Sequence, residues 1–305
     1  MRNAILMASI LVGVGGCSSE STSGTGSLDV FVMPEAAIID GLTPGTDEEN
    51  ISDGWTVTYT RFLATVGNFR ASVSISPSDA VSEPTVYLLN LQNVPASGFA
   101  LAHFDEMAAT RWDRVGFDMP MATGTNMCAP GIDAGDCATM KNEELSVWVT
   151  GSIARDGSPT VSFNWKIPAG AAFADCHNSD GLSGIAITSG ATQQAELTIH
   201  GDHWFFTRYP TGDESMSPVS RCASWIAAAD GADGTTPDQN VTNGELEAFD
   251  AVDAFSTSAS AGDCRYELSS FPHPVNNAYD YVLQMARSLG HFQGEGDCET
   301  RSDLN

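Results

Sequence analysis

Positive charge is scarce in this chain of 305 residues, which has 13 Lys and Arg against 39 Asp and Glu and a formal net charge of −26. Lysine occurs only at positions 141 and 166. Binding to nucleic-acid phosphates needs a cationic surface, and docking on anionic lipid needs clustered Lys and Arg. We therefore expect no nucleic-acid partner and no polybasic attachment to a membrane.

Motifs for several common chemistries are also missing. No CxxC pair occurs, so a zinc ribbon, a thioredoxin-type site and haem attachment have no support. No Walker loop occurs, no GxGxxG follows a strand, and the GLSGI string around Ser183 does not match GxSxG. The sequence therefore assigns no catalytic residue.

The first seventeen residues have the three parts of a bacterial export signal. Arg2 supplies a positive start, residues 4–14 are apolar, and Val14-Gly15-Gly16-Cys17 ends the run. This run is shorter than the roughly 17 residues that a membrane-spanning helix needs. The closing string resembles the lipobox of bacterial lipoproteins. The resemblance implies that residues 1–16 are a signal peptide and that Cys17 carries a thioether-linked diacylglycerol.

The residues after the cysteine predict where the mature chain resides. Residues 17–27 comprise the lipidated cysteine and a polar, flexible tether that lets a folded domain stand clear of the lipid. Position 18 is Ser, whereas Asp there favours inner-membrane retention in Gram-negative lipoproteins. The resemblance thus implies a protein of the cell envelope, held at the outer membrane by its lipid anchor. The sequence identifies no protein partner.

Alternating apolar and polar residues, many of them β-branched or aromatic, dominate residues 28 to about 206. Clusters such as SPSDAVSEP and DGSP separate the runs. The pattern predicts a mainly β fold, with an antiparallel β-sandwich over residues 28–215. DGWTVTYTRFLATVGNF, PTVYLLNLQ and RWDRVGFDMP resemble envelope lipoproteins with a transthyretin-like or immunoglobulin-like sandwich. The predicted strands are Leu28–Met33, Trp55–Val66, Ala71–Ile75, Thr85–Leu91, Arg114–Phe117, Leu145–Ile153, Thr160–Ile167 and Ala195–Phe206.

The pattern changes beyond Pro218, and residues 216–305 are predicted to form a small, disulfide-tied helical C-terminal appendage. Apolar spacing predicts helices over Val219–Ala229, Glu245–Phe255 and Asn277–Leu289. Gly290 is expected to cap the last of these helices.

Six cysteines remain when Cys17 is set aside: Cys128, Cys137, Cys176, Cys222, Cys264 and Cys298. An even number in an exported chain predicts three disulfides, for which fifteen pairings are possible. Spacing favours Cys128–Cys137 as a local pair, with Cys264–Cys298 and Cys176–Cys222 as the others.

The sharpest local feature is His200-Gly201-Asp202-His203, which follows the strand-like QQAELTI. Two imidazoles three residues apart, with a carboxylate between them at a glycine turn, can converge on one cation. In the structural alternative, Asp202 caps a turn and the histidines are polar residues at a strand end. The string is similar to part of the HxHxDH motif of the metallo-β-lactamase superfamily, but Thr198 stands at its first position. Because the surrounding pattern also lacks alternating αβ units, that fold is rejected.

Two histidines do not complete a tetrahedral site, so other ligands must come from elsewhere in the chain. The glycines around His291 in GHFQGEGDC allow unusual backbone geometry, which makes this residue the preferred third histidine. His103, His177 and Glu295 are the other candidates. The expected cofactor is a transition metal, Cu or Zn, bound by His200, Asp202, His203 and His291.

A second candidate ion site is the acidic segment from residue 230 to residue 245. It resembles an EF-hand loop, which implies Ca²⁺ binding by Asp230, Asp233, Asp238, Asn240 and Glu245. The segment spans sixteen residues where the family uses twelve, and Gln239 replaces the glycine of the sharp turn. A capping box from Thr242 to Glu245 accounts for this glutamate without an ion.

The favoured interpretation is a lipid-anchored envelope protein that binds a metal ion or small ligand without catalysis. One alternative is a metal-dependent hydrolase that uses the same histidines, with Asp202 or Glu295 as base. Another is a purely structural or adhesive surface lipoprotein. A β-sandwich hosts all three functions, so fold alone does not decide among them.

Overall fold

The fold was analysed in a computed structural model, which describes residues 24–210, 219–256 and 264–301. The signal peptide expected over residues 1–16 and the lipidation site at Cys17 lie outside the described residues. In the described part of the chain, no helix is both long enough and apolar enough to cross a membrane.

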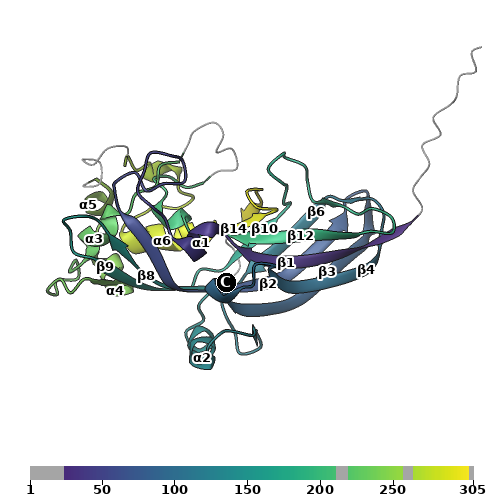
Figure 1. The fold of residues 1–305 in the computed structure, drawn as a ribbon, viewed down its shortest axis with the longest axis horizontal. Coiled ribbons are helices and arrows are strands. Elements are labelled where there is room, and N and C mark those ends of the chain that lie inside the picture. The colour runs from purple at the N-terminus through teal and green to yellow at the C-terminus, as the bar shows by residue number, and fades with distance from the viewer. Residues whose placement is uncertain (1–23, 211–218, 257–263, 302–305) are drawn as a thin grey trace, which may run out of the picture.

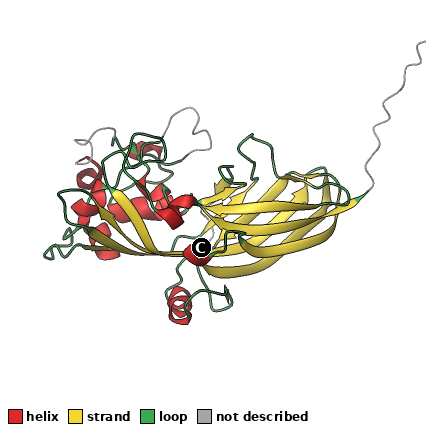
Figure 2. Ribbon diagram, viewed as in Figure 1, coloured by secondary structure: helices red, strands yellow, loops and turns green. Residues whose placement is uncertain are grey.

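Two β-sheets form most of the molecule (Figures 1 and 2). The smaller sheet has the order β14 (Gly290–Phe292), β12 (Thr192–Ile199), β1 (Thr25–Pro34) and β4 (Phe99–Ala108). The larger sheet has the order β13 (Asn240–Thr242), β9 (Val161–Ile167), β8 (Val147–Ala154), β2 (Thr56–Val73), β6 (Arg114–Met119), β10 (Ala171–Ala174) and β15 (Glu299–Arg301). β3 (Ser76–Asn90) pairs with β2 and with β7 (Met127–Cys128). β5 (Arg111–Trp112) and β11 (Ile185–Ala186) form a separate ribbon.

The mainly β, sandwich-like prediction is confirmed. The smaller sheet lies over the part of the larger sheet that contains β2, β3 and β6 (Figure 1). Alternate residues of each sheet enter the layer between them, where the rings of Phe69 and Phe104 lie 5.8 Å apart between centroids. Most neighbouring strands are antiparallel, and the parallel pairs are β1–β12, β9–β13 and β3–β7.

Some strand boundaries differ from those predicted. The strands expected over residues 55–66 and 71–75 form the single strand β2, whose pairing with β3 shifts register between Gly67 and Phe69. SPSDAVSEP, expected as a turn, lies inside β3 because it pairs with the far half of β2. Its Pro84 is tolerated because a proline at a free strand edge breaks no ladder hydrogen bond. β4 was not predicted, nor were the shorter strands β5, β7, β10, β11, β13, β14 and β15.

The helices of the C-terminal part are shorter than predicted, and one predicted helix is divided into two. Only Ser224–Ala229 of the first expected helix is helical, as α3. The second divides into α4 (Asn243–Ala248) and α5 (Ala251–Ser256). The third is α6 (Ala278–Ala286), whose N-cap is Asn277. Two further α-helices are α1 (Ala36–Asp40) and α2 (Ala134–Asn142). Short 3₁₀ turns occur at Leu91–Asn93, at His203–Phe205 (η2) and at Leu268–Ser270.

Gly290 was expected to cap the last helix. It is instead the first residue of β14. A Cβ atom there would lie 2.6 Å from the ring of Phe173 and 2.9 Å from that of Phe117. Glycine is therefore required by the close approach of the strand to the two rings. This approach brings β14, which carries His291, onto the edge of the smaller sheet.

The described residues of the C-terminal part, 219–256 and 264–301, share one hydrophobic core with the sheets. The ring of Trp165 on β9 stacks on Trp225 of α3 at 5.5 Å, and it meets Trp204 edge-on at 6.3 Å. All three side chains are fully buried or nearly so. The helices therefore cover the β8–β9 end of the larger sheet (Figure 2).

Three disulfides are present in the described residues. The predicted local pair Cys128–Cys137 is confirmed. The other two predicted pairs are wrong, because the bonds are Cys176–Cys298 and Cys222–Cys264. Antiparallel pairing of β10 with β15 places Ala174 opposite Glu299, which brings the neighbouring cysteines together. Spacing along the chain contains no information on this pairing.

Candidate metal centre

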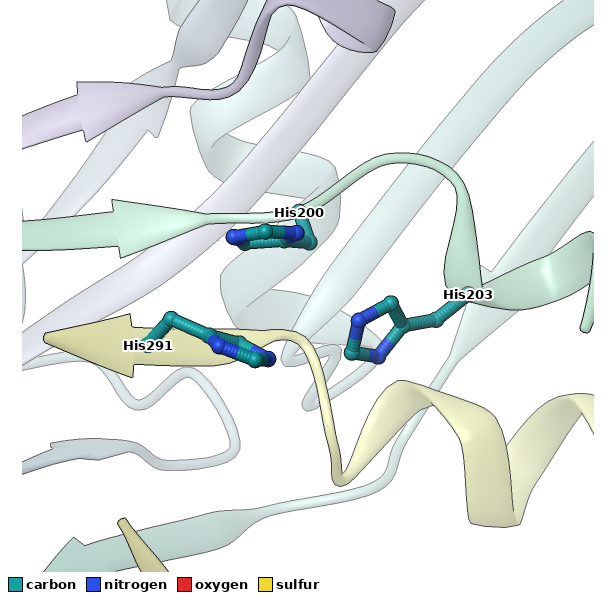
Figure 3. Close-up of side chains that lie close together, drawn as sticks. All are labelled: His200, His203 and His291. Atoms are coloured by element: carbon teal, nitrogen blue, oxygen red, sulfur yellow. The ribbon is translucent and has the colours of Figure 1, made fainter. Parts of the chain in front are cut away.

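Three buried histidines meet at the edge of the smaller sheet (Figure 3). His200 directly follows β12, and its backbone N–H donates to the carbonyl of Leu289 at 2.8 Å. His291 lies in β14, where it pairs with Thr198. His203 begins η2 on the far side of the turn. The exposed fraction is 3% for His200, 8% for His291 and 1% for His203. The predicted histidines are therefore brought together in the interior.

The three imidazoles are close enough to bind one ion. One nitrogen from each lies within 4.8 Å of the others. The ring centroids of His200 and His291 are 4.0 Å apart, and His203 lies 5.3 Å and 5.2 Å from them. Zinc binds histidine nitrogens at about 2.0–2.1 Å, so these nitrogens would move closer together on sharing one ion.

Hydrogen bonding at His203 leaves one of its nitrogens available. Its Nδ1 lies 2.9 Å from Oγ of Ser288, and that hydroxyl donates its hydrogen to the carbonyl of Met285 at 2.9 Å. Because the hydroxyl hydrogen is already used, the ring must donate through Nδ1. Nε2 of His203 therefore carries the lone pair, as a metal ligand requires.

His200 and His291 each have a buried nitrogen with no hydrogen-bond partner among the described residues. These atoms are Nε2 of His200 and Nδ1 of His291. The other nitrogen of His200, Nδ1, lies 3.7 Å from Oδ1 of Asp202 and 3.7 Å from Oε2 of Glu35. The ring of His291 forms a hydrogen bond with the backbone of Gly296. Each ring is thus held on one side and unsatisfied on the other. This is the arrangement that metal-binding histidines show.

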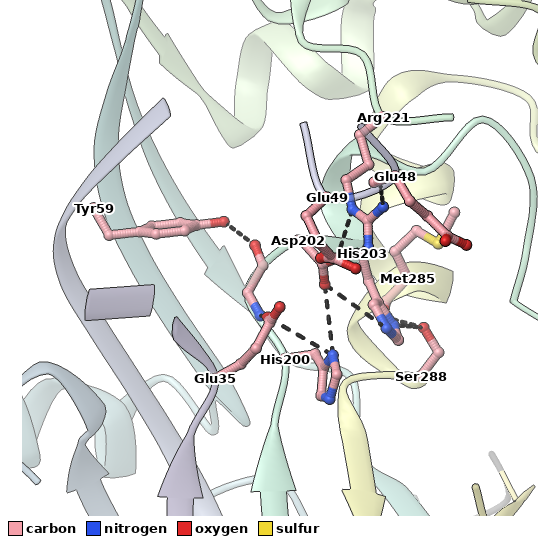
Figure 4. Close-up of polar contacts among 11 residues, drawn as sticks. Glu35, Glu48, Glu49, Tyr59, His200, Asp202, His203, Arg221, Met285 and Ser288 are labelled. Carbon is pink, nitrogen blue, oxygen red and sulfur yellow. Dashed lines mark hydrogen bonds and ion pairs between the residues drawn. The ribbon is translucent and has the colours of Figure 1, made fainter. Parts of the chain in front are cut away.

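Asp202 lies beside the histidines but is held by Arg221 (Figure 4). Oδ2 of Asp202 accepts from Nε of Arg221 at 2.7 Å and lies 2.5 Å from its Nη2. Oδ1 is buried without a hydrogen bond in the described structure and lies 3.9 Å from Nε2 of His203. The carboxylate therefore belongs to the surroundings of the centre, where it orients the rings and offers one further oxygen.

Glu35 and Tyr59 also hold the turn, and sequence analysis missed both. Oε2 of Glu35 accepts from the backbone N–H of Gly201 at 2.8 Å, and the hydroxyl of Tyr59 donates to the carbonyl of the same residue. Parallel pairing of β1 with β12 places Pro34 opposite Ile199, so Glu35 reaches the turn. No local signal in the sequence indicates this long-range pairing.

The surroundings of the three histidines shift their pKa values in different directions. Burial opposes protonation of His200, but the nearby carboxylates of Asp202 and Glu35 outweigh it and raise its pKa to about 9. Burial lowers the pKa of His203 to about 3 and that of His291 well below its ordinary value. Burial, reinforced by the charge of Asp202, raises the pKa of Glu35 to about 8. Two of the rings are therefore neutral imidazoles at neutral pH, which is the ligand form.

A cavity of about 270 Å³ reaches the centre from one side. His291 and Ser288 line it, together with Tyr209, Pro272 and Asp297. A ligand in this cavity would contact both the third histidine and the hydroxyl that orients His203. The cavity thus opens beside the histidine group.

The other predicted ligands lie outside the histidine group. His103 on β4 is bonded through its two nitrogens to Asp29 at 2.5 Å and Asp105 at 3.1 Å. The ring of His177 contacts the carbonyl of Asn178. Glu295 is outside the group, although its charge contributes to the raised pKa of His200.

The EF-hand-like segment brings only part of its expected donors together. Oxygens of Asp230, Asp238 and Glu245 lie within 4.8 Å of one another, whereas Asp233 is not in this group. The backbone N–H of Asn240 donates to Oδ1 of Asp238 at 2.9 Å. Backbone N–H groups occupy the carboxylates: Asp230 accepts from residues 238 and 239, and Glu245 accepts from residues 231 and 242. The capping box from Thr242 to Glu245 is confirmed. Hydrogen bonds therefore account for the shape of this loop.

Comparisons of the chain with protein-family models, with curated proteins and with solved structures find no match.

Proposed function

We propose that this chain binds a single transition-metal ion through His200, His203 and His291. The observation that carries the proposal is the trio of buried imidazoles, in which His200 and His291 each have a nitrogen without a hydrogen-bond partner and His203 uses only Nδ1 for Ser288. A buried polar atom without a partner is costly, and the two such nitrogens, on His200 and His291, would be satisfied by an ion that also binds His203.

Zinc is the ion that this donor set favours. All three donors are imidazole nitrogens, and zinc binds three histidines with a fourth position open. Cu(II) prefers a tetragonal set of nitrogen and oxygen ligands, so copper would recruit Asp202 as well. The charge of Asp202, already compensated by Arg221, would orient His200 through an outer-shell contact.

Elemental analysis of the mature chain from residue 18, purified from an oxidising compartment without chelator, tests the proposal. We expect near-stoichiometric zinc, and its loss in the H200A/H203A variant. The matched control is H103A/H177A, which removes two histidines outside the centre. Equal metal content in the two double variants, or no metal in the parent protein, would refute the centre and leave the structural or adhesive interpretation.

Elemental analysis of the same samples also tests whether the loop of residues 230–245 binds calcium. Calcium in the H200A/H203A variant that disappears in D230N/D238N would assign a separate ion to the loop of residues 230–245. Calcium absent from all samples would mean that hydrogen bonds alone order this loop.

Hydrolysis at the same ion is a second candidate function. Three protein ligands leave an open position on zinc, and the cavity beside His291 gives a substrate access to it. Zinc-loaded protein that hydrolyses small esters or phosphoesters, with loss of activity in H291A, would establish catalysis. A zinc-loaded protein without turnover would support binding alone.

We further propose that Cys17 anchors the chain at the outer membrane of the cell envelope. The lipobox supports this, and the first strand, β1, begins at the end of the molecule farthest from the helices, so a tether there would leave the metal centre clear of the lipid (Figure 1). In a Gram-negative host we expect the full chain in the outer-membrane fraction with the mass of two lipid additions. The C17S variant should lose both. Unmodified parent protein in the periplasm would contradict the anchor.

A further inference from the structure

A hollow of about 380 Å³ lies on the outer face of the larger sheet and shares no residue with the histidine centre. It is formed over β2, β6, β10 and the neighbouring strands β3 and β15. Three arginines line it: Arg70, Arg114 and Arg301. In a chain with only eleven arginines and a net charge of −26, this concentration of positive charge is unexpected.

The sheet register explains why the arginines converge. Arg70 pairs with Gly116 and Arg114 pairs with Ser72, so these residues share one face of the sheet. Phe117 pairs with Phe173 on the opposite, buried face. The outward positions between the arginines are therefore occupied by small residues.

Gly116 is required for this arrangement. A Cβ atom on it would lie 3.1 Å from the guanidinium carbon of Arg70 and 2.5 Å from the carbonyl oxygen of Phe173. The missing side chain allows Arg70 to cross β6, where its Nη2 donates to that carbonyl at 3.2 Å. Gly116 and Ala174 together leave the space that the arginines surround.

Each arginine of the hollow also lies beside a carboxylate. Nη2 of Arg301 is 3.9 Å from Oε2 of Glu299. Arg114 contacts Asp175 through Nη1 at 2.7 Å, and Nη1 of Arg70 donates to Asp118 at 2.8 Å. A guanidinium has five N–H donors, so these carboxylates leave donors for a ligand.

We propose that this hollow binds the phosphate group of a small molecule. Planar guanidinium groups match the oxygens of phosphate, and three of them around one hollow offer more N–H donors than their carboxylate partners use. The hollow is larger than phosphate itself, so a phosphate monoester with a compact organic group fits as well as inorganic phosphate. Arg70, Arg114 and Arg301 would contact the oxygens, and Asp175 would compete with the ligand for Arg114.

Calorimetric titration of the mature chain from residue 18, at constant ionic strength, tests the proposal with inorganic phosphate and with glycerol phosphate. In R114Q/R301Q we expect affinity to fall by about tenfold or more, since charge-assisted hydrogen bonds are lost. The control R155Q removes a charge from the turn between β8 and β9 and should leave affinity unchanged. Tighter binding of glycerol phosphate would identify an ester as the ligand, and equal binding would identify phosphate.

Asp175 provides a test in the opposite direction. D175N removes the competing carboxylate, so phosphate should bind about threefold more tightly. Binding retained in H200A/H203A would show that phosphate does not act at the metal centre. No measurable binding to the parent protein, equal losses in R114Q/R301Q and R155Q, or weaker binding in a folded D175N protein would overturn the proposal.

Discussion

Ser288 decides which ring nitrogen of His203 carries the hydrogen in the proposed metal centre. Its hydroxyl donates to the carbonyl of Met285 and accepts from Nδ1 of His203, so it selects the ring form whose Nε2 can bind an ion. Ser288 is 6% exposed, and water cannot readily replace it in this role. The position of one hydroxyl therefore decides whether His203 presents a lone pair.

We predict that S288A lowers zinc affinity by about 10–100-fold, the usual effect of losing an outer-shell partner of a metal-binding histidine. Competition with a chromophoric chelator measures this affinity. S158A, which changes a serine on the β8–β9 turn, is the control and should bind zinc as the parent does. Unchanged affinity in S288A would mean that His203 does not bind through Nε2.

At the scale of elements, the bond between Cys176 and Cys298 joins the end of β10 to the segment that follows β14. It closes a loop of 122 residues, whereas Cys128–Cys137 closes one of 9. The backbone N–H of His177 also donates to the carbonyl of Asp297 at 2.9 Å across the same junction. This junction holds the segment that carries His291 against the sheets.

Removal of the longer crosslink should therefore destabilise the fold more than removal of the shorter one. From loop closure in the unfolded chain we expect losses of about 5 kcal/mol for C176A/C298A and about 2.5 kcal/mol for C128A/C137A. Urea unfolding of both double variants measures the difference. C176A/C298A should also bind zinc more weakly, because His291 is less well positioned. Equal stability of the two variants would contradict this account.

At the scale of the whole molecule, the stacked tryptophans join the sheets and the C-terminal helices in one hydrophobic core. Trp165 comes from β9 and Trp225 from α3, and both are buried. A separate appendage would have a core of its own, whereas here the buried residues of both parts form one continuous cluster.

W225A should consequently destabilise the sheets together with the helices, by about 3–5 kcal/mol. Hydrogen exchange read by mass spectrometry should show protection falling in β8 and β9 as well as in α3. V252A, at a position that is 70% exposed on α5, is the control and should change stability by less than about 0.5 kcal/mol. Loss of protection confined to the helices would indicate that they fold independently.

Local features of this protein were predictable from its sequence because their causes are local. Alternation of apolar residues predicted the strands β1, β2, β3, β6, β8, β9 and β12, and the spacing Thr242 to Glu245 predicted a capping box that the structure confirms. The nine-residue spacing of Cys128 and Cys137 predicted their bond. The turn that contains His200 and His203 suggested a metal site for the same reason, since both ligands lie within four residues.

Long-range pairing was decided only by the tertiary structure. Parallel pairing of β1 with β12 brings Glu35 to the turn, and antiparallel pairing of β12 with β14 brings His291 beside His200. Pairing of β10 with β15 selects Cys298 as the partner of Cys176. The sequence by itself determined which residues can bind an ion or form a disulfide. Which of them meet depends on strand pairing and core packing, which join residues far apart in the chain and leave no signature in its local pattern.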